Sequence, residues 1–326
     1  MNHSNKHIYK EFCSLEPEIP LFSKDWWLDA VCGNENWDVA IVKNNNEIIA
    51  SMPYFISKRF GFKIISQPPM TQVNGPWIKA KKAKKSKILD YEKKVMNELI
   101  NQLPQFDYFS QNWLYKYKNW YPFFLKGYKQ TTRYTHILFD ISDEQKNWDG
   151  LGGNIRGEIR KAKNRFKLTI DTEPTIEKFL DLYQMTYKRQ GRKPHFENDQ
   201  ILTLDYECKK NNCRKIFLAK DNSGEFHAGI YIVWDENAAY YILGGADPSL
   251  RNSGAHSFAM WEAIRFSSSV TKRFDFEGSM EPSIERFFRN FGTDQTPYFS
   301  IRKTNSNILK LLEAMSLFKK NNFKFF

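Results

Sequence analysis

The chain has 326 residues, of which 41% are hydrophobic, 26% are charged and 16% are aromatic. This is the composition of a globular protein with enough length for two cores, so it excludes a disordered or low-complexity chain. No apolar run approaches the ~20 residues that a transmembrane helix needs. Residues 1–10 are polar and basic, whereas a secretory signal would place an apolar segment there. We therefore expect a cytoplasmic protein without a transmembrane segment.

The net charge indicates a type of binding partner, and the cysteines bear on the redox state and on metal binding. A net charge of +12 predicts an anionic partner such as nucleic acid or a phosphorylated molecule. Much of this charge lies in the runs 79–87 and 156–167, which are also typical of solvated helix faces. The four cysteines, at positions 13, 32, 208 and 213, match neither a zinc spacing nor a redox pair. We therefore expect reduced thiols and no metal site.

The first half of the sequence predicts a small α/β unit. Its apolar spacings indicate the order helix, three strands, helix, strand, helix, strand. The expected helices are 24–31, 85–102 and 120–126, and the expected strands are 37–42, 47–56, 62–66, 106–110 and 135–141. The polar stretch 142–153, which ends in glycines, is the expected linker.

The second half predicts a similar order of elements. The expected helices are 154–164, 174–191, 199–211, 254–268 and 282–291, and the expected strands are 167–173, 215–220, 226–234, 238–243, 273–277 and 298–302. The repeated order predicts an α/β fold with mixed sheets in two tandem units, residues 1–145 and 150–326. The oligomeric state stays open.

A glycine-rich connection in the second half is the first candidate site. It joins the strand 238–243 to the helix 254–268, and a helix that starts after small residues presents free N–H groups and partial positive charge to an anion. Ser253 can cap this helix, and Arg251 adds a cation. An ordinary capped turn explains the same residues. The candidate binding residues are Gly245, Asp247, Arg251, Asn252, Ser253, Gly254, Ala255 and His256.

Carboxylates at the end of the strand 273–277 form the second candidate. Ligands sit at strand ends in α/β units, and Glu277 would have a raised pKa if the surrounding phenylalanines bury it, which suits a general base. The alternative is a structural carboxylate paired with Arg286 or Arg289. Tyr240 and Tyr241 point to opposite faces of their strand, so one of them should face the cleft, where it could protonate a leaving group.

The order of these motifs resembles the GNAT acyltransferase superfamily. In that family a Gln/Arg-x-x-Gly-x-Gly/Ala motif after a strand binds the pyrophosphate of acyl-CoA. Arg251-x-x-Gly254 matches this pattern, whereas His256 stands where glycine or alanine is expected. The resemblance implies direct attack of an amine on an acyl carbonyl within a ternary complex, with backbone amides polarising the carbonyl oxygen.

A closer resemblance is to the Fem aminoacyltransferases and the BioF2-like acetyltransferase domains. It is carried by the opening segment 154–162 and by the segments 240–248, 261–264, 274–279 and 284–292. The resemblance implies a GNAT-like transferase domain at 150–326 and a degenerate GNAT-like domain at 1–145. The implied catalytic residues are Glu277, Tyr241 and Asp275, and the implied substrate-binding residues are Tyr240, Arg189, Arg192, Ser279 and Arg289.

Two classes of function follow from the sequence. The first is transfer of an acyl group from acyl-CoA, or of an aminoacyl group from tRNA, to an amine of a small molecule or a cell-envelope precursor. The second is a non-enzymatic protein, either a nucleic-acid-binding protein or a scaffold on a degenerate transferase fold. The element order and the loop after the strand 238–243 favour the first class, whereas the net charge alone would suit the second.

Overall fold

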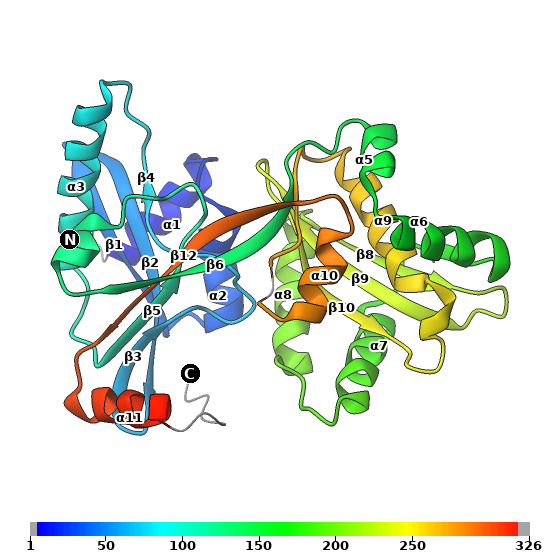
Figure 1. The fold of residues 1–326 in the computed structure, drawn as a ribbon. Helices are drawn as coiled ribbons and strands as arrows, with labels where there is room; N and C mark the ends of the chain where they lie inside the picture. Colours follow the sequence, from blue (N-terminus) through cyan, green and yellow to red (C-terminus); the bar gives the residue numbers. More distant parts are fainter. Residues whose placement is uncertain (1–4, 279, 319–326) are drawn as a thin grey trace. The chain divides into compact units, whose positions relative to one another are not determined.

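The computed structural model describes residues 5–278 and 280–318, which form two compact units (Figure 1). Unit 1 comprises Met1–Arg133 and Tyr298–Phe326, and unit 2 comprises Tyr134–Pro297. The chain passes from unit 1 to unit 2 within β6 (Lys129–Leu138) and returns within β12 (Asp294–Thr304).

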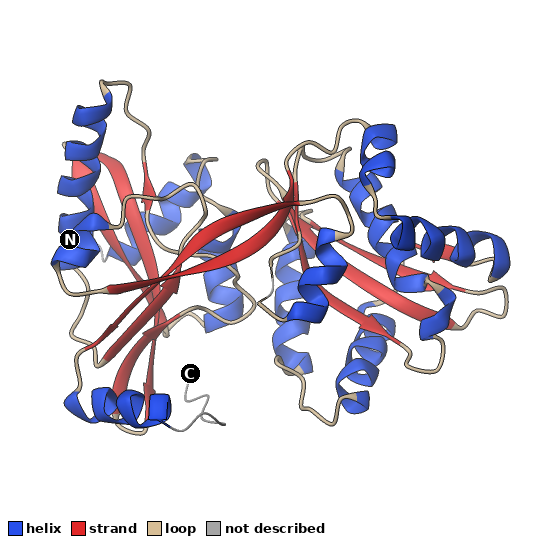
Figure 2. Cartoon of the chain, viewed as in Figure 1, coloured by secondary structure: helices blue, strands red, loops and turns tan. Residues whose placement is uncertain are grey.

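Unit 1 is a mixed sheet with helices packed against it (Figure 2). Its strands follow the order β1-β2-β3-β5-β12, with β4 paired to β2. The strands are β1 (Trp37–Asn44), β2 (Glu47–Arg59), β3 (Phe62–Ser66), β4 (Trp77–Ile78) and β5 (Tyr108–Asn112), and the helices are α1 (Asn5–Leu15), α2 (Asp25–Cys32), α3 (Lys85–Asn101), α4 (Tyr121–Leu125) and α11 (Asn307–Phe318). The main core lies under α3 and α4, where Val95, Leu99 and Phe123 pack on the sheet.

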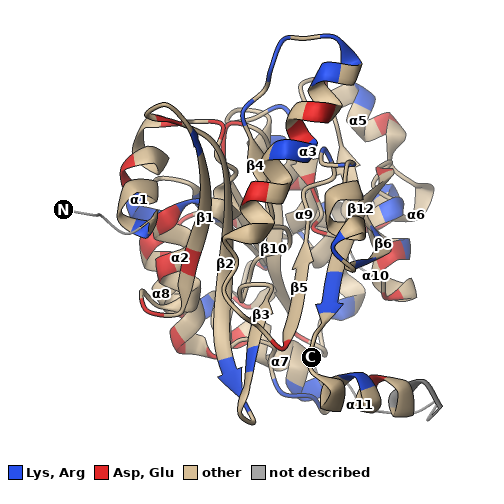
Figure 3. Cartoon of the chain, turned by 90° about the vertical axis from the view of Figure 1, so that its left-hand side faces the viewer, with Lys and Arg blue, Asp and Glu red and all other residues tan. Residues whose placement is uncertain are grey.

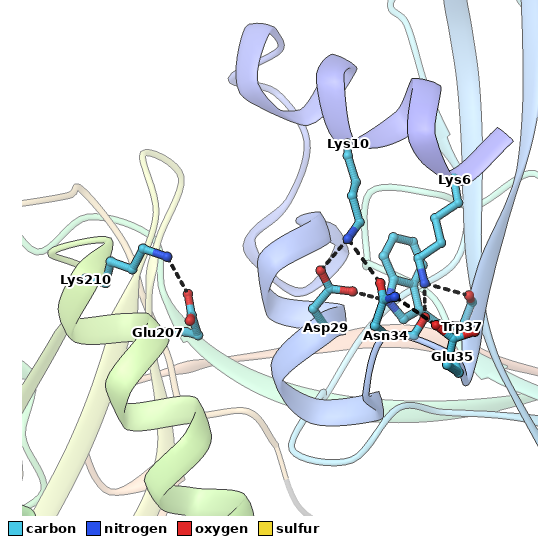
Figure 4. A network of polar contacts seen from close by, with 8 residues as sticks. All are labelled: Lys6, Lys10, Asp29, Asn34, Glu35, Trp37, Glu207 and Lys210. Atoms are coloured by element: carbon cyan, nitrogen blue, oxygen red, sulfur yellow. Dashed lines mark hydrogen bonds and ion pairs between the residues drawn. The ribbon is translucent and has the colours of Figure 1, made fainter. Parts of the chain in front are cut away.

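Polar contacts hold α1 and α2 beside the start of β1 (Figure 4). Lys10 Nζ lies 2.6 Å from Asp29 Oδ2, and Asp29 Oδ1 accepts a hydrogen bond of 2.8 Å from Trp37 Nε1. Lys10 also donates to Asn34 Oδ1 at 3.2 Å. Because these groups are partly exposed, the contacts orient the helices more than they stabilise the unit.

Unit 2 repeats the strand order of unit 1 without repeating its residues. Its strands are β7 (Thr169–Asp171), β8 (Arg214–Lys220), β9 (Phe226–Trp234), β10 (Ala239–Ala246) and β11 (Phe274–Asp275), together with β6. In unit 1 the antiparallel strands β1, β2 and β3 are followed by β5, which pairs in parallel with β3 and antiparallel with β12. In unit 2 the antiparallel strands β8, β9 and β10 are followed by β11, which pairs in parallel with β10 and antiparallel with β6. The expected α/β fold with mixed sheets is confirmed.

Helices cover both faces of the unit 2 sheet (Figures 1 and 2). The helices are α5 (Glu144–Gly150), α6 (Gly153–Arg160), α7 (Ile176–Arg189), α8 (Asn198–Lys210), α9 (Ala255–Ser267) and α10 (Pro282–Arg289). The core between α9 and the sheet contains Phe258, Ile264 and Ile230. On the other face α7 lies so close that a Cβ at Gly229 would come within 3.0 Å of the Phe179 ring.

The boundary between the units differs from the expectation in two ways. The expected linker 142–153 carries α5, whose Asp143 side chain caps the helix by accepting from the Lys146 N–H at 2.9 Å, and whose Trp148 ring lies 5.3 Å from that of Trp261. Each sheet is also completed by a strand from the other half of the sequence. In unit 1, β5 pairs with β12, which lies in the second half, and in unit 2, β11 pairs with β6, which lies in the first half. Local patterns identify strands but not their partners, so the exchange was not foreseen.

Candidate functional site

The candidate site lies where β10 and β11 separate. The two strands pair in parallel at only two positions, Ala239 with Phe274 and Tyr240 with Asp275. β10 continues to Ala246 and stays paired with β9 throughout, with a bulge between Tyr241 and Leu243. From Tyr241 onward, no described strand pairs with β10 on the β11 side. Backbone N–H and C=O groups on such an edge can bind an extended ligand.

A strained turn places Glu277 at this opening. Glu277 has φ of 61° and the next residue, Gly278, has φ of 56°, a left-handed conformation that costs a non-glycine residue ~1 kcal/mol or more. A Cβ at Gly278 would lie 2.3 Å from the carbonyl oxygen of Tyr134, so only glycine fits there. Strained backbone of this kind clusters at functional sites.

Asp275 holds the turn in place. Its Oδ1 accepts hydrogen bonds from the hydroxyl of Thr135 and, at 2.9 Å, from the backbone N–H of Glu277. The side chain is only 7% exposed, and burial raises its pKa from 3.8 to about 6 even though both hydrogen bonds act in the opposite direction. Asp275 therefore positions Glu277, and its own Oδ1 is already occupied.

Glu277 has the electrostatic character of a base held in an apolar setting. Burial raises the pKa of its carboxyl well above the usual range, and the charge of Asp275 adds to this shift. The neighbouring Phe276 ring packs at 5.1 Å from Phe288 and 5.4 Å from Phe291, which forms an apolar wall. Arg289 pairs with Glu285 at 3.0 Å, and no described cation forms an ion pair with Glu277. The anticipated pairing with an arginine is thus absent from the described chain.

Thr135 and His136 belong to this site but had no signal in the sequence. Both lie on β6, and Thr135 stands 140 positions before Asp275 in the chain. His136 is buried, its Nδ1 lies 2.9 Å from the Thr293 hydroxyl, and its Nε2 lies 3.9 Å from Glu285. Burial lowers the pKa of His136. Only the pairing of β6 with β11 brings these residues to the carboxylates.

The space over Gly244 is filled by aromatic side chains. A Cβ at Gly244 would lie 2.0 Å from the hydroxyl of Tyr241 and 3.1 Å from Cε1 of His256. The His256 ring packs 5.4 Å from that of Phe287, and burial lowers the pKa of His256 to about 4. Burial raises the pKa of the Tyr241 hydroxyl. His256 is therefore neutral at pH 7 and offers no charge to a phosphate.

The loop after β10 uses most of its own N–H groups. Asp247 accepts from the N–H of Ser249 at 2.7 Å with its side chain and from the N–H of Leu250 at 3.3 Å with its carbonyl. The N–H of Ser253 bonds to Leu250, and that of Ala255 bonds to the Ser253 hydroxyl. The loop therefore bonds part of its own N–H groups, as a capped turn does.

A carboxylate also stands at the start of α9. Gly254, with φ of 77°, precedes the helix, and a Cβ there would lie 2.2 Å from the Glu158 carbonyl and 3.0 Å from Glu158 Oε2. Glu158 is paired with Lys161 at 2.8 Å. A negative charge at this helix start repels a pyrophosphate from the position where the helix dipole would otherwise attract it. The Glu158 carboxylate, whose charge Lys161 partly compensates, and the side chains over Gly244 therefore lie beside the expected position of the acyl-CoA pyrophosphate.

The other expected site residues are dispersed. Gly245 serves helix packing, because a Cβ there would lie 2.4 Å from the backbone nitrogen of Tyr183 in α7. Ser253, Ala255 and Tyr240 are buried. The remaining arginines and Asn252 are exposed, and the structure does not bring them to Asp275 or Glu277: Arg189, Arg192, Arg251 and Arg289. Ser279 lies outside the described residues.

Two absences concern the described residues only. They contain no cluster of three His, Cys, Asp or Glu side chains suited to a metal ion. Within residues 5–278 and 280–318, none of the helices has the length and apolar character needed to cross a bilayer. The buried His227 has a carboxylate partner, since its Nε2 lies 3.4 Å from Asp221 Oδ2.

Comparisons with known proteins agree with this geometry. Residues 152–290 match the family described as "Acetyltransferase (GNAT) domain". This segment, which contains the separation of β10 from β11 and the Glu277 turn, is a GNAT acetyltransferase domain. No curated protein matches the chain by sequence.

Solved structures show the fold of the whole chain. It is similar to FemX, with a TM-score of 0.67, 12% identity, and coverage of 95% of this chain and 98% of that one. It is also similar to the C-terminal domain of an Agrobacterium fabrum protein named as a lysylphosphatidylglycerol synthetase, with a TM-score of 0.57, 11% identity and coverage of 96% and 97%. A third is L-PGS from Bacillus licheniformis, with a TM-score of 0.54, 11% identity and coverage of 97% and 98%. The chain thus carries a segment, residues 152–290, that matches the GNAT acetyltransferase domain family, and it shares the fold of FemX, in agreement with the resemblance inferred from its motifs.

Proposed function

We propose that the protein is an N-acyltransferase in which Glu277 is the general base. The observation that carries this proposal is the Glu277 carboxylate, with its raised pKa, at the point where β10 leaves β11. An acyl donor lying along the open edge of β10 would present its carbonyl to backbone N–H groups, which stabilise the oxyanion as it forms. Glu277 would take the proton from an amine as that amine attacks the carbonyl, and the ester or thioester bond to the donor would then break as the protonated Glu277 returns a proton to the leaving oxygen or sulfur.

Of the two donors that the sequence leaves open, aminoacyl-tRNA is the better supported. The loop that would hold the CoA pyrophosphate bonds part of its own N–H groups, and the Glu158 carboxylate stands beside it. The chain nevertheless carries a net charge of +12. In unit 1 the segment between β4 and α3 exposes Lys81, Lys82 and Lys84, which would contact a phosphate backbone. Figure 3 shows this basic segment above α3.

The acceptor that we propose is an amine of a small molecule or a cell-envelope precursor. This choice is consistent with the name of the Agrobacterium fabrum protein, a lysylphosphatidylglycerol synthetase, which designates a product that carries an amino acid. Because charged tRNA is made in the cytoplasm, we expect the reaction to take place there. The arginines at the end of α7, Arg189 and Arg192, are exposed and free to contact an anionic group of the acceptor.

The test measures donor binding and transfer separately. Thermal unfolding is followed with acetyl-CoA and, in parallel, with a mixture of aminoacyl-tRNAs, and we expect only the tRNA to raise the melting temperature. Transfer of a labelled amino acid to a panel of amines should then fall ~10²–10⁴-fold in Glu277→Gln. Glu207→Gln, on the surface of α8, is the matched control and should leave transfer unchanged.

Two results would contradict the proposal. Stabilisation by acetyl-CoA alone would overturn the choice of donor while leaving the transferase intact. Equal transfer rates in Glu277→Gln and the Glu207→Gln control would remove Glu277 as the base.

A further inference from the structure

We propose that one end of unit 1, formed by α11 and the β2–β3 hairpin, docks on an anionic membrane surface. The first observation is the exposed face of α11. Ile308 and Leu311 are each 62% exposed, Met315 is 50% exposed and Leu312 is 37% exposed. These positions follow the i, i+3, i+4, i+7 spacing of a single helix face. A soluble helix usually buries such a face, whereas here it is the face directed away from the unit.

The opposite face of α11 attaches the helix to unit 1. Leu309 is buried in a small cluster with Ile64 and Tyr108, and Phe62 packs against it. The Thr304 hydroxyl donates to Glu313 Oε1 at 2.7 Å. The orientation of α11 is therefore fixed by its polar and buried contacts, so the exposed apolar face is a property of the folded unit.

The tip of the β2–β3 hairpin lies at the same end of unit 1. Gly61 and Lys63 of the hairpin line one hollow of about 450 Å³ together with Asn305, which directly precedes α11. Phe60 at the tip is 80% exposed and follows Arg59. An exposed phenylalanine beside basic side chains is the composition of a segment that enters the headgroup layer of a bilayer.

Basic residues near the apolar face of α11 favour an anionic binding partner. Lys303 Nζ donates to the Lys126 carbonyl at 2.8 Å. Burial lowers the pKa of Lys303, and the charges of Lys126 and Lys310 lower it further, so three lysines lie close together. In Figure 3 basic residues colour the end of β2, the start of β3 and the start of α11.

This combination of charge and apolar area fits lipid better than protein. A second copy of the chain would bring the same positive charge against itself, which is unfavourable. An anionic bilayer satisfies both features, because its headgroups neutralise the lysines and its acyl region accepts the apolar face. Such docking would hold the enzyme at a surface where lipid-linked acceptors lie, but it does not depend on the proposed reaction.

Vesicle sedimentation tests the proposal with the full chain. We expect binding to vesicles of phosphatidylcholine and phosphatidylglycerol in equal parts, little binding to phosphatidylcholine alone, and weaker binding as the salt concentration rises. Leu311→Asp removes an apolar side chain and adds a repelled charge, so it should reduce the partition coefficient about tenfold or more. Leu89→Asp, which is 55% exposed on α3, is the matched control and should bind as the parent does.

Folding and self-association are checked on the same samples. Circular dichroism and thermal unfolding should not distinguish the two variants, because both residues are exposed. The proposal is overturned if the parent does not bind anionic vesicles, or if Leu311→Asp binds them as well as Leu89→Asp does. It is also overturned if light scattering shows a dimer that Leu311→Asp dissociates, since the face would then belong to a second copy.

Discussion

Replacing Asp275 with Asn should stabilise the protein at neutral pH, because it removes a charge that is unfavourable in the buried position. Burial raises the pKa of Asp275 from 3.8 to about 6. At ~1.4 kcal/mol per unit, a shift of about 2 units corresponds to about 3 kcal/mol. Below pH 3.8 the carboxyl is protonated in both the folded and unfolded states, so its contribution to stability is fully present there. It is lost as the pH rises through about 6, because the folded state holds the charge poorly.

The amide in Asp275→Asn carries no charge and so avoids this loss. Its Oδ1 can still accept from the Thr135 hydroxyl and the Glu277 N–H. The variant should therefore match the parent near pH 3 and exceed it by up to about 3 kcal/mol near pH 7. Urea unfolding at a series of pH values, followed by circular dichroism, measures this difference as a shift in the midpoint.

A second buried aspartate provides a control of opposite sign. Asp205 is 6% exposed, like Asp275, but it lies 3.0 Å from Arg214 Nε. Asp205→Asn leaves that cation without its partner and should lose on the order of 3 kcal/mol at pH 7. The reasoning is refuted if Asp275→Asn unfolds at a lower urea concentration than the parent at pH 7, because the Asp275 charge would then be stabilising.

Three further predictions follow from the site. Gly278→Ala should lower the free energy of unfolding by more than ~1 kcal/mol in urea, since its Cβ would lie 2.3 Å from the Tyr134 carbonyl; an unchanged midpoint would show that the turn is not constrained. The kcat/KM for transfer should rise with pH as the Glu277 carboxyl ionises at its raised pKa, and a pH profile of Glu277→Gln should lack this rise. In the double variant Glu158→Gln/His256→Gly, calorimetry should detect CoA binding that the parent lacks, and no gain would mean that other groups close the pocket.

The sequence alone predicted most of the helices and strands, because each of them has a regular local spacing of apolar residues. The strands β3 and β9 have the expected bounds, the helix α3 differs from expectation by one residue at one end, and the helices α8 and α9 differ by one residue at each end. Elements with weak or short patterns were missed, including α5, whose polar sequence resembled a linker. The helix α11 was also missed, although its apolar spacing is regular.

The sequence also identified Glu277 and Asp275 as candidates, because carboxylates after a strand are conspicuous. It could not show that Asp275 holds the Glu277 turn. That role depends on the Glu277 N–H and on Thr135, which reaches the site only through the pairing of β6 with β11. Pairing between distant strands is decided by the whole core, which no local pattern encodes.

Only the tertiary structure shows which side chains lie beside the glycine-rich loop. Its residues allow either an anion site or an ordinary turn, and the sequence left both open. The fold brings Glu158 beside Gly254 and places the side chains of Tyr241 and His256 over Gly244. Which atoms fill a space depends on how helices and strands pack in three dimensions. Apolar periodicity therefore predicted the elements and the motif resemblance predicted the class of protein, while packing determined the state of the site.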